Sequence, residues 1–226
     1  MATTIPANEI VTIKPAEIQR IPIRIIGDTP LIVHNWDEKS KRQMLDKEQK
    51  ATKTKAQPPK HPFKDFVNSM YWLTERPTAA NDAALEKAFA DALNAGARFG
   101  FPVTAVKQAA NSAAYRNGWV SNQMGLRGAY FLETDDVDYF EIKGSIPKMR
   151  EDMVRVKGSA DLRYRAEFSG WYADFTLVYN GNGNITLEQI INCIQAGGFS
   201  CGIGEWRPER DGTFGRFHVA AGDELN

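Results

Sequence analysis

The chain has 226 residues, of which 42% are hydrophobic and 11% aromatic, which is enough apolar material to bury a sizeable core. Its 28 basic and 28 acidic residues cancel, so a global positive field is excluded and any nucleic-acid binding must use a local patch. The chain opens without a signal-peptide pattern and has no run of about 18 apolar residues, so we expect a cytoplasmic protein with no membrane contact.

The first predicted element is a strand that runs to a bend, within residues 18–33. Apolar side chains alternate there at Ile21, Ile23 and Ile25, as in a strand with one buried face. The sequence Gly-Asp-Thr-Pro at residues 27–30 predicts a turn, and a second short apolar run follows it.

A strongly basic segment follows at residues 39–64, where lysine and arginine far outnumber acidic residues and prolines interrupt the chain. This composition predicts a helix that passes into a basic loop. Two interpretations of the segment remain open. In the first interpretation, residues 39–50 are a flexible clamp on nucleic acid. In the second, the whole run is a solvated surface loop without a specific partner.

Two helices are predicted next, at residues 82–97 and 101–118, because apolar side chains recur there at helical spacing. A glycine near the end of each, Gly96 and Gly118, is expected to stop the helix. Two strands are predicted after them, at residues 126–132 and 138–143, before a break at residues 144–147.

Residues 153–165 carry the most regular alternation in the chain and predict a β-hairpin. We expect two rows of basic side chains to share one of its faces, and Tyr164 to be exposed for stacking on a base. The basic residues of these rows are Arg155, Lys157, Arg163 and Arg165.

The last third of the chain predicts a strand, a helix and a short closing strand. The strand covers residues 171–179, with Trp171 and Phe175 directed to the core. Thr186 is expected to cap the helix, and Gly197-Gly198 to end it. The closing strand is predicted at residues 217–219.

This order of elements predicts an α+β fold: a ferredoxin-like βαββαβ antiparallel sheet with helices on one face, plus basic insertions. We expect a single domain over residues 1–226, with an inserted basic and helical segment around residues 36–100.

A glycine-rich stretch precedes the closing strand, with the sequence Gly-Phe-Ser-Cys-Gly-Ile-Gly-Glu-Trp-Arg-Pro at residues 198–208 and Gly-Thr-Phe-Gly-Arg-Phe at residues 212–217. Together with Gly-Asp-Thr-Pro-Leu-Ile-Val-His-Asn at residues 27–35, it resembles the RAMP superfamily, which includes RNA-recognition-like backbone subunits of CRISPR complexes. The segment at residues 27–35 especially resembles small solitary members carried by bacteriophages. The resemblance implies a glycine-rich loop against RNA and head-to-tail stacking of copies into a filament or open helix.

The residues of the same loop support nucleic-acid binding independently of the resemblance. Glycines let backbone amides approach a phosphate closely, nearby arginines add positive charge, and Trp206 offers a ring for a base. The alternative is that the glycines only shape a tight crossover and that Trp206 covers the sheet. The loop lacks the lysine of a phosphate-binding nucleotidase loop, so nucleotide hydrolysis is not expected.

The favoured hypothesis is a non-catalytic, sequence-tolerant binder of RNA or single-stranded DNA that assembles with itself along the strand and needs no cofactor. Its predicted contact residues are His34, Lys39, Lys41, Arg42, Arg155, Lys157, Arg163, Tyr164, Arg165, Gly202, Gly204, Trp206, Arg207, Arg210 and Arg216.

Two other hypotheses remain open. The first, implied by the resemblance, is a phage-encoded mimic of a CRISPR backbone subunit, an anti-CRISPR inhibitor that binds guide RNA or complex subunits in the host cytoplasm. The second is a metal-independent endoribonuclease that uses His34 as general acid or base. A histidine hydrogen-bonded at a strand end is the simpler explanation of His34. The two cysteines and scattered histidines do not match a zinc pattern, so no metal is expected.

Overall fold

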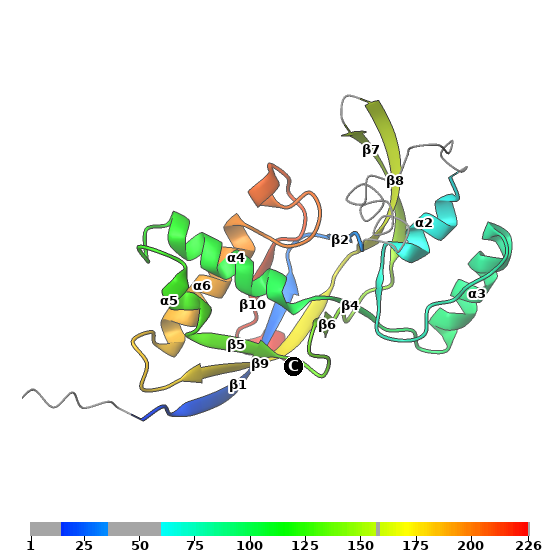
Figure 1. Cartoon of the computed structure of the whole chain (residues 1–226). Helices are drawn as coiled ribbons and strands as arrows, with labels where there is room; N and C mark the ends of the chain where they lie inside the picture. Colours follow the sequence, from blue (N-terminus) through cyan, green and yellow to red (C-terminus); the bar gives the residue numbers. More distant parts are fainter. Residues whose placement is uncertain (1–14, 36–59, 157–158, 226) are drawn as a thin grey trace, which may run out of the picture.

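A computed structural model of the chain describes residues 15–35, 60–156 and 159–225. This part is a mixed α+β structure with antiparallel sheets and five α-helices (Figure 1). Among these residues, no helix combines the length and the apolar character that crossing a membrane requires.

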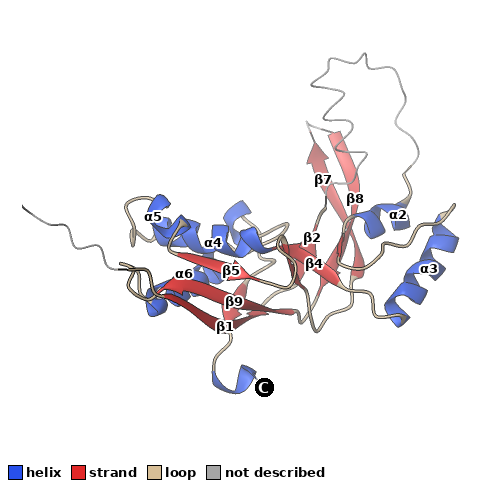
Figure 2. Cartoon of the chain, turned by 60° about the horizontal axis from the view of Figure 1, so that its bottom comes forward, coloured by secondary structure: helices blue, strands red, loops and turns tan. Residues whose placement is uncertain are grey.

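The largest sheet has four strands, and every neighbouring pair is antiparallel. In spatial order they are β10 (Phe217–Val219), β1 (Ile18–Gly27), β9 (Tyr172–Asn180) and β5 (Tyr130–Glu133). Helices α4 (Val103–Arg116) and α6 (Leu187–Ser200) cover one face of this sheet (Figures 1 and 2). The alternation predicted for the first strand is confirmed, because Ile23 and Ile25 are buried under the helices.

Helix α6 begins as predicted but ends later. The Thr186 side chain and Gln189 form a reciprocal capping box, which satisfies two backbone donors at the helix start. The predicted end at Gly197-Gly198 is wrong, since the helix continues to Ser200. Both glycines allow close packing instead: a Cβ at Gly197 would lie 2.6 Å from the amide nitrogen of Ala110 in α4.

Two three-stranded sheets form the other side of the molecule. One has the order β2 (Leu31–Val33), β8 (Ser159–Phe168), β7 (Lys148–Val156), and the other has β3 (Tyr71–Trp72), β4 (Phe99–Pro102), β6 (Tyr139–Glu141). Helix α2 (Pro62–Asn68) packs against β8, and α3 (Asp82–Asn94) packs against α2. The predicted helix at residues 82–97 is therefore confirmed, whereas β3 and β4 were not predicted.

Two predicted elements need correction. The strand expected from residue 126 begins as a helical turn, α5 (Met124–Arg127), and extended backbone starts only at Tyr130. The hairpin is longer than expected, because the pairing of β7 with β8 extends from Lys148 opposite Glu167 to Val156 opposite Ser159. Its register places Arg163 opposite Asp152 and Arg165 opposite Arg150, whereas the side chains of the other predicted basic row, Arg155 and Lys157, lie outside what the structure describes.

One hydrophobic core joins the four-stranded sheet to the smaller sheets. Trp171, which is fully buried, stacks on Phe140 with 6.5 Å between ring centroids, and its indole nitrogen donates to the Thr29 carbonyl at 3.0 Å. Phe175 is also buried, and its ring centroid lies 5.2 Å from the ring centroid of Phe140. The prediction that Trp171 and Phe175 serve packing is confirmed.

Candidate nucleic-acid interface

The glycine-rich loop, defined here as residues 201–216, connects α6 to β10 and includes a single turn of 3₁₀ helix, η1 (Pro208–Arg210). Gly202 and Gly204 have φ of 64° and 79°, in the left-handed region that side chains disfavour. A Cβ at Gly204 would also lie 2.6 Å from the Ile32 carbonyl oxygen. The glycines are therefore required by a tight backbone path directly against strand β2.

Hydrogen bonds tie the glycine-rich loop to the bend after β1. The Gly215 amide donates to the Pro30 carbonyl, and the Asp28 amide to the Arg216 carbonyl, both at 2.9 Å. The Arg216 amide in turn donates to the Thr29 hydroxyl oxygen at 2.9 Å. The two sequence segments that carry the family resemblance, nearly two hundred residues apart, thus form one unit in the structure.

A hollow of about 230 Å³ lies where this unit meets β4 and α4. His34 lines it together with Gly202, Gly204 and Arg207, so four of the predicted contact residues are brought together. Tyr71 lines it as well, and burial raises the pKa of its phenol to about 12. The phenol is therefore a neutral hydrogen-bond donor at physiological pH.

Arg207 both stabilises the loop and lines the hollow. Its guanidinium donates to the Gly204 carbonyl at 3.1 Å and to one carboxylate oxygen of Glu209 at 3.0 Å. Arg116 from α4 reaches the other oxygen of Glu209, also at 3.0 Å. One carboxylate thus holds two arginines, and Glu205, a second carboxylate that lines the hollow, pairs with the buried Arg165.

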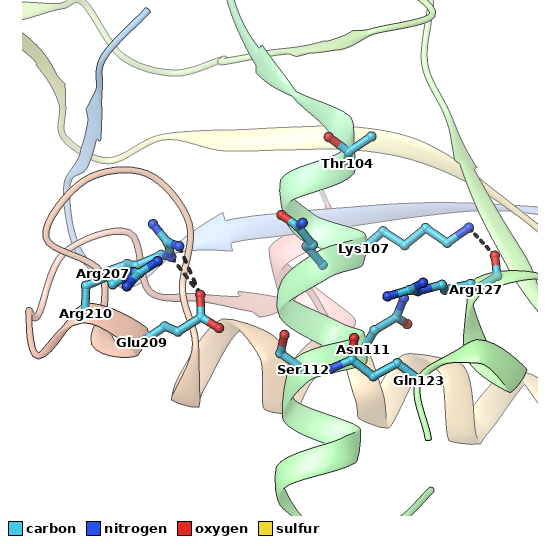
Figure 3. Close-up of a pocket in the computed structure, with 10 residues that line it drawn as sticks. Thr104, Lys107, Asn111, Ser112, Gln123, Arg127, Arg207, Glu209 and Arg210 are labelled. Atoms are coloured by element: carbon cyan, nitrogen blue, oxygen red, sulfur yellow. Dashed lines mark hydrogen bonds and ion pairs between the residues drawn. The ribbon is translucent and has the colours of Figure 1, made fainter. Parts of the chain in front are cut away.

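A larger groove of about 510 Å³ lies on the other side of Arg207, between η1, α4 and α5. Figure 3 shows Arg207 and Arg210 on one side of α4 and Lys107 and Arg127 on the other. The remaining lining residues are polar: Thr104, Gln108, Asn111, Ser112, Gln123 and Glu209. The groove and the hollow share Gln108, Arg207 and Glu209 in their linings, so the two concave regions adjoin one another.

Lys107 and Arg127 were missed by sequence reasoning. Each stands alone among uncharged neighbours, in a helix and in a short helical turn, so neither produces a local cluster of charge. Lys107 is half-buried at the edge of the apolar face of α4, next to the buried Val106 and one turn from the buried Ala110, so its position in the helix gave no separate signal. Only the path of the glycine-rich loop beside α4 turns that position into part of a site.

The β7–β8 hairpin contributes fewer exposed contact residues to the candidate interface than predicted. Arg165 is only 3% exposed, and it forms ion pairs with Asp152 at 3.3 Å and with Glu205 at 3.4 Å. It is therefore a buried link between the hairpin and the glycine-rich loop rather than a surface cation. Arg163 is partly exposed beside Asp161, and Tyr164 is partly buried against the core.

The other predicted contact residues are distributed as follows. Trp206 is 40% exposed, and Arg210 is exposed on η1. Arg216 is partly buried where the loop enters β10. The remaining candidates lie outside what the structure describes: residues Lys39, Lys41, Arg42 and Lys157, and the side chain of Arg155.

Three cations of the open face of the four-stranded sheet, opposite the helices, are paired with carboxylates. Arg24 and Lys143 both bind Asp174, at 2.7 Å and 3.0 Å. Arg20 pairs with Glu133 at 3.4 Å. Each of these three cations therefore has a carboxylate partner in the structure.

No family model matches this chain, and a search of curated proteins finds no match either. Within residues 15–35, 60–156 and 159–225, no three His, Cys, Asp or Glu side chains are grouped to hold a metal ion. Cys193 and Cys201 are both buried, and burial raises the pKa of the Cys193 thiol, which keeps it protonated.

Proposed function

We propose that this protein is a non-catalytic binder of single-stranded nucleic acid, RNA or DNA, and that the concave surface between the glycine-rich loop and α4 is its contact site. One observation carries the proposal. His34 and the loop glycines, distant in sequence, line a hollow that adjoins a groove with four cations and one carboxylate.

The chemistry of this surface favours the backbone of a strand over its bases. Arginine and lysine side chains bind phosphate oxygens, and phosphate contacts carry no sequence information. Trp206, exposed at the edge of the loop, provides a stacking surface that accepts any base. The proposed binding is therefore sequence-tolerant, and Arg165 is left out of the contact set because it is buried.

We also propose that the four-stranded sheet and its two helices are a ferredoxin-like βαββαβ unit. The chain order β1, α4, β5, β9, α6, β10 and the sheet order β10-β1-β9-β5 support this, with both helices on one face (Figure 2). The smaller sheets are then built from two insertions, because β2, β3 and β4 lie between β1 and α4 in the chain, and β6, β7 and β8 lie between β5 and β9. This arrangement is what the resemblance to the RAMP superfamily implies.

The test of binding is fluorescence anisotropy with labelled poly-U RNA and poly-dT of equal length, at low salt. The variant Arg207→Gln/Arg210→Gln removes two groove cations, while Arg116 still pairs with Glu209, so the loop keeps its anchor. We expect weaker binding to both strands. The matched control is Arg20→Gln on the open face of the sheet, which should bind like the wild type. No binding by the wild type, or equal loss in the control, would contradict the proposal.

Head-to-tail self-association is the second part of the proposal, and it rests on the resemblance alone. Sedimentation velocity with and without a long poly-U strand tests it. We expect the protein to sediment as larger species only when the strand offers several sites. A single species of one bound protein per long strand at saturating protein would overturn this part and leave the binding proposal intact.

A further inference from the structure

The side of the groove formed by Lys107 and Arg127 has uncompensated positive charge. Among the residues that the structure describes, Glu209 is the only carboxylate that lines the groove, and it is already bound to Arg207 and Arg116. Within the described ranges, neither Lys107 nor Arg127 has a carboxylate within ion-pair distance. An anionic group is therefore the natural ligand for this side.

Lys107 is held in place before any ligand arrives. Its ammonium donates to the Arg127 carbonyl at 2.7 Å and sits over the Phe131 ring, 4.4 Å from the centroid. Burial lowers the pKa of this lysine, so its charge lacks some of the water that would stabilise it. A phosphate oxygen beside it would restore that stabilisation.

Asn111 is a buried polar side chain in the floor of the same groove. It is 5% exposed, and its amide oxygen accepts a hydrogen bond from the Tyr130 hydroxyl at 3.3 Å. Burial raises the pKa of Tyr130, so the phenol keeps its proton and remains the donor. With its oxygen engaged, Asn111 has its amide nitrogen as the donor to offer a ligand oxygen.

From this geometry we infer that Lys107, Arg127 and Asn111 form a second phosphate subsite, and that a bound strand crosses α4. This inference rests on the proposed function and adds the path of the strand. One phosphate lies at Arg207 and Arg210, and another at Lys107 and Arg127 across the helix (Figure 3). The uncharged side chains of Thr104, Gln108 and Ser112 form the floor beneath the sugar between them.

The test uses single-stranded oligonucleotides in which one linkage at a time is replaced by an uncharged methylphosphonate. With the wild type, we expect two separate linkages at which neutralisation weakens binding. With Lys107→Met/Arg127→Gln, one of the two should become insensitive, and the slope of log affinity against log salt should fall by about 1. Arg98→Gln, an exposed arginine paired with Glu141, is the matched control and should keep both linkages sensitive.

Two outcomes separate this inference from the proposed function. If the wild type binds the unmodified strand but the Lys107/Arg127 variant keeps both sensitive linkages, the second subsite is wrong and the binding proposal stands. If the wild type binds no strand at low salt, both fall. Because Arg127 is exposed, Arg127→Gln alone is expected to fold normally, and it repeats the test should the double variant unfold.

Discussion

Replacing Gly197 or Gly198 by alanine tests the close packing of α6 more sharply than any other substitution in the fold. A Cβ at Gly198 would lie 2.0 Å from the Phe217 carbonyl oxygen in β10, and one at Gly197 would lie 2.6 Å from the Ala110 amide nitrogen. Both obstacles are backbone atoms, so no side-chain rotation relieves the contact. The helix would have to move away from α4 and from the sheet.

The size of the effect follows from two opposed terms. Alanine in place of glycine inside a helix stabilises it by about 1 kcal/mol. Overpacking a well-packed interior costs about 1–3 kcal/mol, and a clash with rigid backbone belongs at the upper end of that range. We therefore expect each substitution to lower the free energy of unfolding by about 1–2 kcal/mol. In a chain of this length, each kcal/mol lost lowers Tm by about 2–4 °C.

Urea titration followed by circular dichroism measures this loss, and Gly125→Ala is the matched control. Gly125 is also helical, but among the described residues no atom outside its own helical turn lies within 4 Å of the position its Cβ would take. That substitution should leave stability unchanged or raise it by up to about 1 kcal/mol. If Gly197→Ala and Gly198→Ala are as stable as Gly125→Ala, the account of why α6 runs through its glycines is wrong.

Two further predictions concern charged groups. Arg165→Leu should lower the free energy of unfolding by about 3 kcal/mol, the low end for a broken buried ion pair, because Asp152 keeps its bond to Arg150. Adding Asp152→Leu should recover part of the loss in urea titrations, and a single variant as stable as the wild type would refute the buried link. For His218, burial alone would lower the pKa, but bonds to Asp28 and Glu224 outweigh it, so the pKa is raised above 6.5. The stabilisation by protonated His218 is complete below pH 6.5 and is lost as pH rises through the folded-state pKa. The Tm difference between wild type and His218→Asn should therefore shrink with rising pH. A Tm difference that stays constant with pH would contradict this prediction.

Elements with strong local signals were predictable from the sequence. The capping box of Thr186, the closing strand and the helix at α3 are set by neighbouring residues, and they lie where expected. The extension of α6 through Gly197 was not predictable, because its cause is Ala110, a residue far away in the chain. A glycine pair in a helix has the same sequence pattern whether it ends the helix or packs it.

The candidate site divides in the same way. The glycine-rich loop is visible in the sequence because its backbone path requires glycine, and Gly202 and Gly204 have the left-handed conformation that explains them. The burial of Arg165 was hidden, since it depends on Asp152 across the hairpin and on Glu205 in the loop. Lys107 was hidden for the opposite reason, because a lone lysine on a helix has meaning only beside the loop that faces it.

The most direct test of the central claim is photo-crosslinking of the full-length protein to a single-stranded RNA that carries 4-thiouridine, followed by peptide mapping. The account predicts crosslinks in the glycine-rich loop, residues 201–216, and in α4, with loss of the loop crosslinks in Arg207→Gln/Arg210→Gln. Crosslinks confined to the open face of the sheet, on β1 and β9, or no crosslink at low salt, would contradict it.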